Sequence, residues 1–411
     1  MIRSTLVAVL VTSMCLVGCG AAPDPGTAFP VDVHGRVVGA TGAALLGMTV
    51  HIGDKTAVTD SDGHFSISGV ATPYDVNIAS TGTGAFTARY EGLTRPDPTL
   101  TFILLFSTGE PNTATIAGTV SGGETLGTAG LFTIAFFTTT DVRFDLESIG
   151  IHPTNNPFTF PVSWFGPEAI SGTLHVLQYA APFNGDPPTA YTGYGTHPAL
   201  AITRDGALTG ADVALTAPGN ATIDGTIVAP DGYRVQEKTL NLEISGAAVP
   251  IAHVDTGDMD FAFTVPDGIP ATAAVFVNAD GNGAGSTAVR LSGITPGSTG
   301  LSISLPSPAQ AIAPADGALV SAGSSVSWTP LPHAVHVLLL TGGPGDPAIH
   351  IVTGGSSVKL PELPTGSTYH WSVAAFGPSE GIDAFTGGAK FFPVLGNSFQ
   401  TVSATRSFVV R

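Results

Sequence analysis

The sequence predicts an all-β protein built from tandem β-sandwich domains after an N-terminal signal. Its 411 residues include 52 Gly and 32 Pro, and only 11% of them are charged, against roughly 25% in an ordinary globular domain. Apolar residues make up 43% of the chain, which is enough to fill buried cores and excludes an intrinsically disordered chain. Short apolar runs bounded by Gly, Pro and Thr favour strands and turns over helices.

The first 18 residues have the pattern of a bacterial export signal. Arg3 precedes a short apolar run at 6–11, and a small residue stands before Cys19, which is the usual order in a secretory signal peptide. Residues 16–19, Leu-Val-Gly-Cys, resemble the lipobox of bacterial lipoproteins. This resemblance implies that Cys19 is acylated, with palmitate among its chains, and becomes the first mature residue. Because no Asp follows Cys19, the resemblance also implies the outer membrane if the bacterium has two membranes.

The mature chain is expected to attach to the membrane through this lipid. Cys15 and Cys19 are the two cysteines, so cleavage after residue 18 leaves no pair for an intramolecular disulfide. The formal net charge of −17 repels nucleic acids and anionic lipid headgroups, so no nucleic-acid partner is expected. Residues 19–29, which contain Gly and Pro, are expected to form the lipidated tether.

Repeated strand patterns divide the rest of the chain into four units. An apolar-x-Gly-x-apolar segment recurs at Gly35, Gly118 and Gly225, where it is expected to open a domain. Segments 209–215 and 299–305 share a Thr-Gly start and strict alternation of apolar residues, which is typical of closing strands. We expect β-sandwiches, each with its own core, at residues 30–108, 112–217, 218–306 and 307–411.

The unit at 30–108 has the clearest family resemblance. Asp62-Gly63 is a tight-turn pair, and Phe65 and Ile67 follow at the period-two spacing of a half-buried strand. This pattern resembles the carboxypeptidase regulatory-like domain, a transthyretin-like β-sandwich that serves as an accessory module. The zinc peptidase for which the family is named is not expected, because no His in the chain has Glu three positions later.

The unit at 307–411 resembles a fibronectin type III or related immunoglobulin-like domain. Trp328 lies on an early predicted strand, and Tyr369 and Trp371 lie on a late one. Such sandwiches fill the core with Trp and fix a corner with Tyr. Residues 406–410 are expected to be the closing strand, after an insertion at 387–400 that departs from the family pattern. The two middle units show only the general sandwich pattern, so no family is assigned to 112–306.

Catalytic and metal-binding patterns are weak, so no enzyme is expected. Asn278, Asp280 and Asn282 place oxygen ligands at alternate positions before Gly283, as at the start of a calcium loop, but the twelfth position is Val289 instead of Glu. A polar hairpin is the favoured interpretation, and no other cofactor is expected. An alternative hypothesis is a hydrolase with a dispersed site, for which the candidates are His152, Glu168, His175 and His197.

Aromatic residues are concentrated in the second unit. Of the chain's aromatic residues, 22 Phe, 7 Tyr and 3 Trp, more than a third lie between 131 and 197. Pro- and Asn-rich segments interrupt this region, so some aromatics are expected on loops, where rings beside amides and carboxylates suit a glycan or a peptide. The candidate ligand-binding residues are Phe158, Phe183, Tyr191, Tyr194, Asn184 and Asp186. The favoured interpretation is a larger sandwich with long packed loops, in which these aromatics are buried.

Three functional hypotheses follow from the sequence. The first is a lipid-anchored envelope protein with a structural, adhesive or binding role and no catalysis. The second is a lipid-anchored protein that binds a glycan or peptide through the aromatic loops of 131–197. The third is the dispersed hydrolase.

Replacing Cys19 tests the lipid anchor. We expect Cys19→Ala to give a soluble or unprocessed precursor, because acyl chains would supply nearly all the membrane affinity of this acidic chain. Detergent-phase partitioning of wild type and variant measures the difference. Equal partitioning would show that the lipoprotein prediction is wrong.

Overall fold

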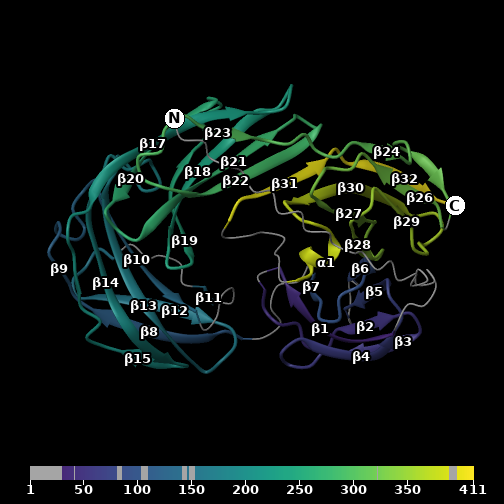
Figure 1. Cartoon of the computed structure of the whole chain (residues 1–411), viewed down its shortest axis with the longest axis horizontal. Coiled ribbons are helices and arrows are strands. Elements are labelled where there is room, and N and C mark those ends of the chain that lie inside the picture. Colours follow the sequence, from purple (N-terminus) through teal and green to yellow (C-terminus); the bar gives the residue numbers. More distant parts are fainter. Residues whose placement is uncertain are drawn as a thin grey trace, which may run out of the picture.

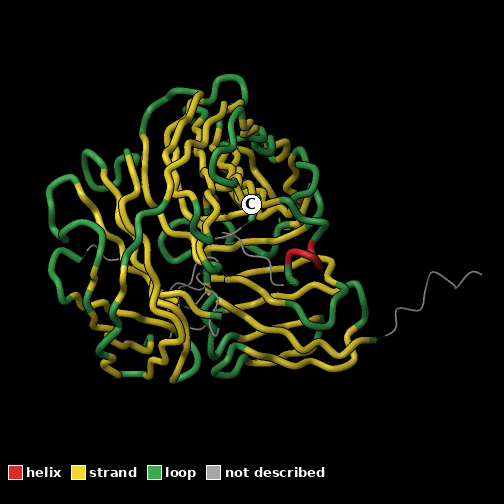
Figure 2. The backbone as a smooth tube through the Cα atoms, turned by 60° about the vertical axis from the view of Figure 1, so that its left-hand side comes forward, coloured by secondary structure: helices red, strands yellow, loops and turns green. Residues whose placement is uncertain are grey.

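The computed structural model describes residues 30–40, 42–80, 86–102, 110–140, 146–147, 153–321, 323–387 and 396–411. The regular secondary structure of the described chain is β-strand apart from one short helix, which confirms the predicted all-β class. Four sandwiches form an arch, with the first and second at its two ends (Figure 1), and strands run through all parts of it (Figure 2). Cys19, the export signal, the tether and His152 lie outside the described residues.

The first sandwich contains the strands β1 (Val31–Gly39), β2 (Thr49–Ile52), β3 (Lys55–Val58), β4 (His64–Val70), β5 (Tyr74–Ala79), β6 (Phe86–Leu93) and β7 (Thr99–Phe102). One sheet has the order β4-β1-β7, and the facing strands have the order β6-β5-β2-β3. The turn before β4 contains Gly63 at φ 75°, a conformation that glycine adopts without steric cost. Phe65 and Ile67 then point into the core, each 5% exposed.

The second sandwich contains β8 (Asn112–Gly118), β9 (Val120–Ser121), β10 (Leu131–Thr139), β11 (Leu146–Glu147), β12 (Phe158–Trp164), β13 (Ala169–Ala180), β14 (Ala190–Thr203), β15 (Gly206–Leu208) and β16 (Val213–Ala214). Its two main sheets have the orders β11-β12-β8-β15 and β10-β13-β14, and β16 pairs with β9. The inner core between the sheets includes Phe137, Phe160 and Trp164.

The third sandwich contains β17 (Gly219–Val228), β18 (Arg234–Ile244), β19 (Ala247–Val254), β20 (Asp260–Asp267), β21 (Ala271–Asp280), β22 (Gly285–Ile294) and β23 (Leu301–Ser304). The fourth contains β24 (Ala311–Ala313), β25 (Ala318–Val320), β26 (Ser325–Trp328), β27 (Val335–Thr341), β28 (Ala348–Thr353), β29 (Ser357–Lys359), β30 (Thr368–Gly377), α1 (Ile382–Phe385), β31 (Ser398–Ser403) and β32 (Arg406–Val410).

The recurring sequence patterns correspond to parallel pairs of opening and closing strands. β1 pairs in parallel with β7, β9 with β16, and β17 with β23. A Cβ atom on Gly118 would lie 2.1 Å from the carbonyl oxygen of Ala211, and one on Gly225 would lie 2.3 Å from that of Leu301. A Cβ atom on Gly35 would lie 2.4 Å from the Phe65 ring. The opening glycines therefore permit a close approach that any side chain would block.

One continuous sheet joins three of the sandwiches. β22 of the third sandwich pairs antiparallel with β31 of the fourth, from Gly285 opposite Ser403 to Arg290 opposite Ser398. β28 of the fourth pairs in parallel with β6 of the first. The resulting sheet has 14 strands, and Figure 1 shows it crossing the top of the arch and descending to the first sandwich.

Two of the hydrophobic cores are shared between sandwiches, which corrects the expectation of one separate core in each unit. The core of the first sandwich includes Val337, Val352 and Phe376 from the fourth. The core of the third includes Phe136 and Tyr191 from the second. A sheet that is covered on both faces must be apolar on both, so the joining of the sandwiches accounts for the low content of charged residues.

The fourth sandwich has the expected Trp core but not the expected tyrosine corner. Trp328 and Trp371 are each 1% exposed and Tyr369 is fully buried. The Tyr369 ring stacks on Phe408 with centroids 6.0 Å apart, while its hydroxyl has no hydrogen-bond partner among the described residues. Tyr369 therefore fills the core without fixing a loop. Within the described ranges, no helix is long and apolar enough to cross a membrane.

Buried histidines make the stability of the fold dependent on pH. His175, His336 and His350 are at most 2% exposed, and burial lowers the pKa of each to about 4. Between about pH 6.5 and 4 the unfolded chain binds these protons and the folded chain does not, so the free energy of unfolding falls with pH by up to about 3 kcal/mol per histidine. Denaturant titrations at pH 7.0 and 4.5 measure this loss.

His350→Leu is the matched variant for this prediction. Both ring nitrogens of His350 lack a hydrogen-bond partner in the described chain, so an apolar replacement removes the desolvation cost without leaving a group unpaired. We expect the variant to keep its stability at pH 7.0 and to lose about a third of the pH dependence. An unchanged pH dependence would contradict the assignment of this stability loss to the buried histidines.

Candidate functional site

Three of the four aromatics expected on loops lie instead in strands. Phe158 begins β12 and is 2% exposed, while Tyr191 and Tyr194 lie in β14 and are 2% and 8% exposed. Phe183 alone of the four is exposed, at 74%. The binding-loop alternative is therefore wrong for these three residues, which are buried as the favoured interpretation expected. Phe158 lies in the inner core of the second sandwich, and the third sandwich covers the face that carries the two tyrosines.

The covered face contains a connected set of rings and polar groups. The imidazole of His175 stacks on Phe136 with centroids 4.9 Å apart and an interplanar angle of 4°. Its Nδ1 lies 3.0 Å from the Tyr194 hydroxyl and its Nε2 2.9 Å from that of Thr138. At the other end of the face, Tyr191 N–H donates to Oδ1 of Asn220 on β17 at 2.6 Å. Of these contacts, the hydrogen bond between Tyr191 and Asn220 joins the second sandwich to the third, and those of His175 lie within the second.

Phe183 lies on a turn that contacts the third sandwich. Asp186 N–H donates to the Phe183 carbonyl at 3.2 Å, which closes the turn, and the Gly185 carbonyl accepts the backbone N–H of His253 on β19 at 2.7 Å. Asn184 is exposed and Asp186 is half-buried. The turn therefore holds Phe183, Asn184 and Asp186 at the junction of two sandwiches.

His253 lies between two carboxylates beside this turn. Its Nδ1 is 3.2 Å from Glu237 Oε1, and its Nε2 is 2.5 Å from Asp255 Oδ1. The three side chains are partly exposed, at 48% for His253, 32% for Glu237 and 72% for Asp255. We call the six residues Phe183, Asn184, Asp186, Glu237, His253 and Asp255 the junction cluster.

The junction cluster combines an exposed ring with several hydrogen-bonding groups. Aromatic faces stack on sugar or peptide groups, and carboxylates accept hydrogen bonds from hydroxyls and amides. Sequence reasoning identified Phe183, Asn184 and Asp186 but missed Glu237 and His253, which come from another domain. The one signal in the sequence for this part of the cluster was the period-two spacing of His253 and Asp255, which in a strand places both side chains on one face.

The candidate hydrolase residues in the described chain do not converge. His175 pairs in register with Thr196, whereas Leu174 pairs with His197, so the two histidines point to opposite faces of the sheet. Glu168 is exposed before β13. Because His175 is buried and held by Thr138 and Tyr194, these side chains form no shared site.

The expectation of no enzyme overlooked one serine motif. Residues 377–381, Gly-Pro-Ser-Glu-Gly, have the spacing of a nucleophile elbow between β30 and α1. The Ser379 hydroxyl donates to the Gly381 carbonyl at 3.0 Å, and His333 Nδ1 lies 3.9 Å from Glu380 Oε1. Ser379 is thus bound to its own turn instead of to a histidine base, and the geometry is that of a local turn.

The three calcium candidates lie at the β21–β22 hairpin. Asn278 is within β21, opposite Glu237 and Ala288. Asp280 ends the strand, and its Oδ1 accepts the backbone N–H of Asn282 at 2.6 Å. These contacts are those of the polar hairpin favoured by the sequence, and calcium binding there stays a prediction.

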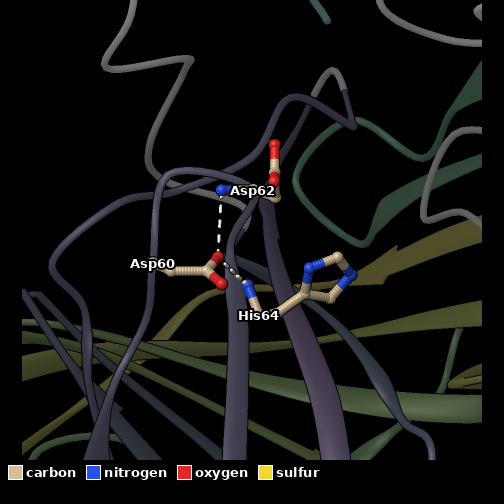
Figure 3. A group of neighbouring side chains, drawn as sticks. All are labelled: Asp60, Asp62 and His64. Carbon is tan, nitrogen blue, oxygen red and sulfur yellow. Dashed lines mark hydrogen bonds between the residues drawn. The ribbon is translucent and has the colours of Figure 1, made fainter.

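A second hairpin brings two acids and a histidine together. Asp60, Asp62 and His64 place ligand atoms within 4.8 Å of one another, and all three are exposed (Figure 3). Asp60 Oδ1 accepts the backbone N–H groups of Asp62 at 3.0 Å and His64 at 2.8 Å. The Arg36 guanidinium donates to the Asp62 carbonyl at 2.9 Å. The group thus shapes the turn, and the adjacent cation opposes a bound metal ion.

Comparisons with known proteins give distant similarities. No family model and no curated protein matches the chain. A leucine-rich repeat protein from Bacteroides thetaiotaomicron is 10% identical over 48% of this chain and 26% of its own, with a TM-score of 0.16. The Bacillus anthracis TIE protein is 11% identical over 67% and 50%, also with a TM-score of 0.16. This chain thus spans half or less of either protein.

Immunoglobulin-like proteins are among the similar structures. The chicken CNTN1 FN1–FN3 domains are 11% identical over 90% of this chain and 92% of their own, with a TM-score of 0.18. Scores this low do not assign the chain to a family.

Substitutions at Tyr191 and Phe183 test the corrected placement of the aromatics. We expect Tyr191→Ala to lower the free energy of unfolding by about 3 kcal/mol or more, because it opens a cavity between two sandwiches. Phe183→Ala should change it by less than about 0.5 kcal/mol. Denaturant titration measures both, and similar losses would contradict the placement.

Tyr191→Phe is the control for the cavity. The Tyr191 hydroxyl is buried without a hydrogen-bond partner in the described residues, so its removal should leave stability unchanged or raise it. A large loss in this variant would point to an interaction of the hydroxyl instead.

Proposed function

We propose that this chain is a lipid-anchored, non-catalytic protein of the bacterial cell envelope, in which four joined sandwiches form a rigid platform for binding. The lipobox-like residues 16–19 support the anchor, and the absence of Asp after Cys19 supports an outer-membrane location. The turn at Gly63 and the core Trp328 support the finer proposal that the terminal sandwiches are of the carboxypeptidase regulatory-like and fibronectin type III-like types.

The observation that carries the proposal is the joining of the sandwiches by backbone pairing. Domains connected only by linkers move relative to one another by default. Here β22 pairs with β31 over six residue pairs and β28 with β6 over five, and two cores extend across domain boundaries. A rigid body of this kind suits a structural or adhesive role, since it holds surface groups at fixed separations.

The exposed ring of Phe183 favours a second, more specific function. An aromatic side chain that is 74% exposed beside hydrogen-bonding groups from two sandwiches is suited to a ligand that both stacks and donates hydrogen bonds. A glycan of the envelope has this chemistry. We therefore propose the junction cluster as a glycan-binding surface.

Binding and turnover measured together test this function. Residues 30–411 should bind envelope oligosaccharides on a glycan array saturably and release no cleavage products. Phe183→Ala should weaken binding by about 5- to 30-fold, as expected for one stacked aromatic. Leu46→Ala, at a position on the first sandwich that is 58% exposed, should have no effect.

Three other results would each contradict one part of the proposal. Cleavage products would show an enzyme, and equal effects of the two substitutions would remove the junction cluster as the binding site. Absence of all binding would leave only the structural role.

A further inference from the structure

A pocket of about 480 Å³ opens where the third and fourth sandwiches meet. Its walls come from the middle of β22, the edge strand β23 and the start of β31, and include Val289, Leu291, Ser302, Ser304, Asn397 and Phe399. This volume lies within the range of about 300–1,000 Å³ that is usual for ligand sites. The pocket lies beside the seam between β22 and β31, so it exists only in the joined structure.

One side of the pocket is a free strand edge. In the described chain β23 pairs only with β17, and Leu305 N–H donates to the Val228 carbonyl on that side at 2.9 Å. Backbone N–H and C=O groups alternate between the two edges of a strand. The backbone N–H and C=O groups of Ser302 and Ser304 therefore point away from β17, toward the pocket.

The other walls are mostly apolar, and contacts with neighbouring residues hold them in place. Val289, Leu291 and Phe399 are partly exposed, and the first two also pack against the core of the third sandwich. The Phe399 ring lies against Gly377, where a Cβ atom would be 2.3 Å from it. Asn397 is held in place, since its Oδ1 accepts the backbone N–H of Ser292 at 2.8 Å.

We propose that this pocket binds an extended peptide segment, which adds as a strand to the free edge of β23. The N–H and C=O groups of Ser302 and Ser304 match the spacing of a peptide backbone, which a glycan or an acyl chain does not reproduce. Alternate side chains of the peptide would enter the pocket against Val289, Leu291 and Phe399. The fitting partner thus has apolar residues at every second position, as in other strand-addition complexes.

Paired substitutions at Ser304 test the proposal with a defined probe. The probe is a fluorescein-labelled, C-terminally amidated peptide, Lys-Val-Thr-Val-Thr-Val-Lys, measured by polarisation with residues 30–411. Ser304→Pro removes the N–H that faces the pocket, at an edge position where proline is tolerated, and should weaken binding at least tenfold. Ser304→Ala keeps the backbone donor and should bind within twofold of wild type.

A modified peptide keeps the test decisive if Ser304→Pro does not fold. The same probe with N-methyl groups on alternate residues has lost its donors toward β23 and should bind wild-type protein at least tenfold more weakly. No binding of the unmodified peptide, or equal binding of both peptides, would overturn the proposal. Phe183→Ala should leave peptide binding unchanged, which separates this pocket from the junction cluster.

Discussion

The pairing of β31 with two neighbours is the interaction on which the arrangement of the arch depends. β31 pairs antiparallel with β30 in its own sandwich and with β22 in the third. Thr401 and Thr287 face each other across the seam and are at most 1% exposed. Because this strand has a partner on both edges, the third and fourth sandwiches share one sheet instead of meeting as separate surfaces.

A buried ion pair of the third sandwich lies beside the same seam. Arg290 Nη2 donates to Glu243 Oε1 at 3.0 Å, and their side chains are 9% and 11% exposed. Burial raises the pKa of Glu243, but hydrogen bonds from Ser292, the Gly293 backbone and Arg290 outweigh it and hold the pKa below its ordinary value. Ser292 also donates its backbone N–H to Asn397, so the ionised carboxylate is connected to the fourth sandwich. The ion pair itself lies within the third sandwich, and the hydrogen bond between Ser292 and Asn397 is its connection to the fourth.

Both candidate binding regions lie where sandwiches meet. The junction cluster joins a turn of the second sandwich to β18 and β19 of the third, and the pocket lies between the third and the fourth. Each of these two sets combines residues from two domains. An arch of ordinary β-sandwiches thus acquires distinctive surfaces from the contacts between its domains, while the individual folds serve as scaffolds.

Local patterns in the sequence were sufficient for the fold class and for much of the strand placement. The glycines at 35, 118 and 225 mark opening strands because close backbone approach leaves no room for a side chain. Phe65, Ile67, Trp328 and Trp371 lie in cores, as period-two alternation predicts. The sequence also identified Phe183, since a turn between strands exposes its central residues.

Such local patterns did not predict the contacts between domains. Tyr191 and Tyr194 stand in a segment for which the sequence left a ligand-binding loop open as the alternative to buried packing, and the third sandwich covering β14 makes them core. Glu237 and His253 meet the Phe183 turn across a domain boundary, and the free edge of β23 faces a wall supplied by β31. The amino-acid sequence by itself determined the all-β class, the turns and the alternation of each strand, because these depend on neighbouring residues. The tertiary structure alone decided which sheet faces are covered and which edges stay free, because burial depends on surfaces that are distant along the chain.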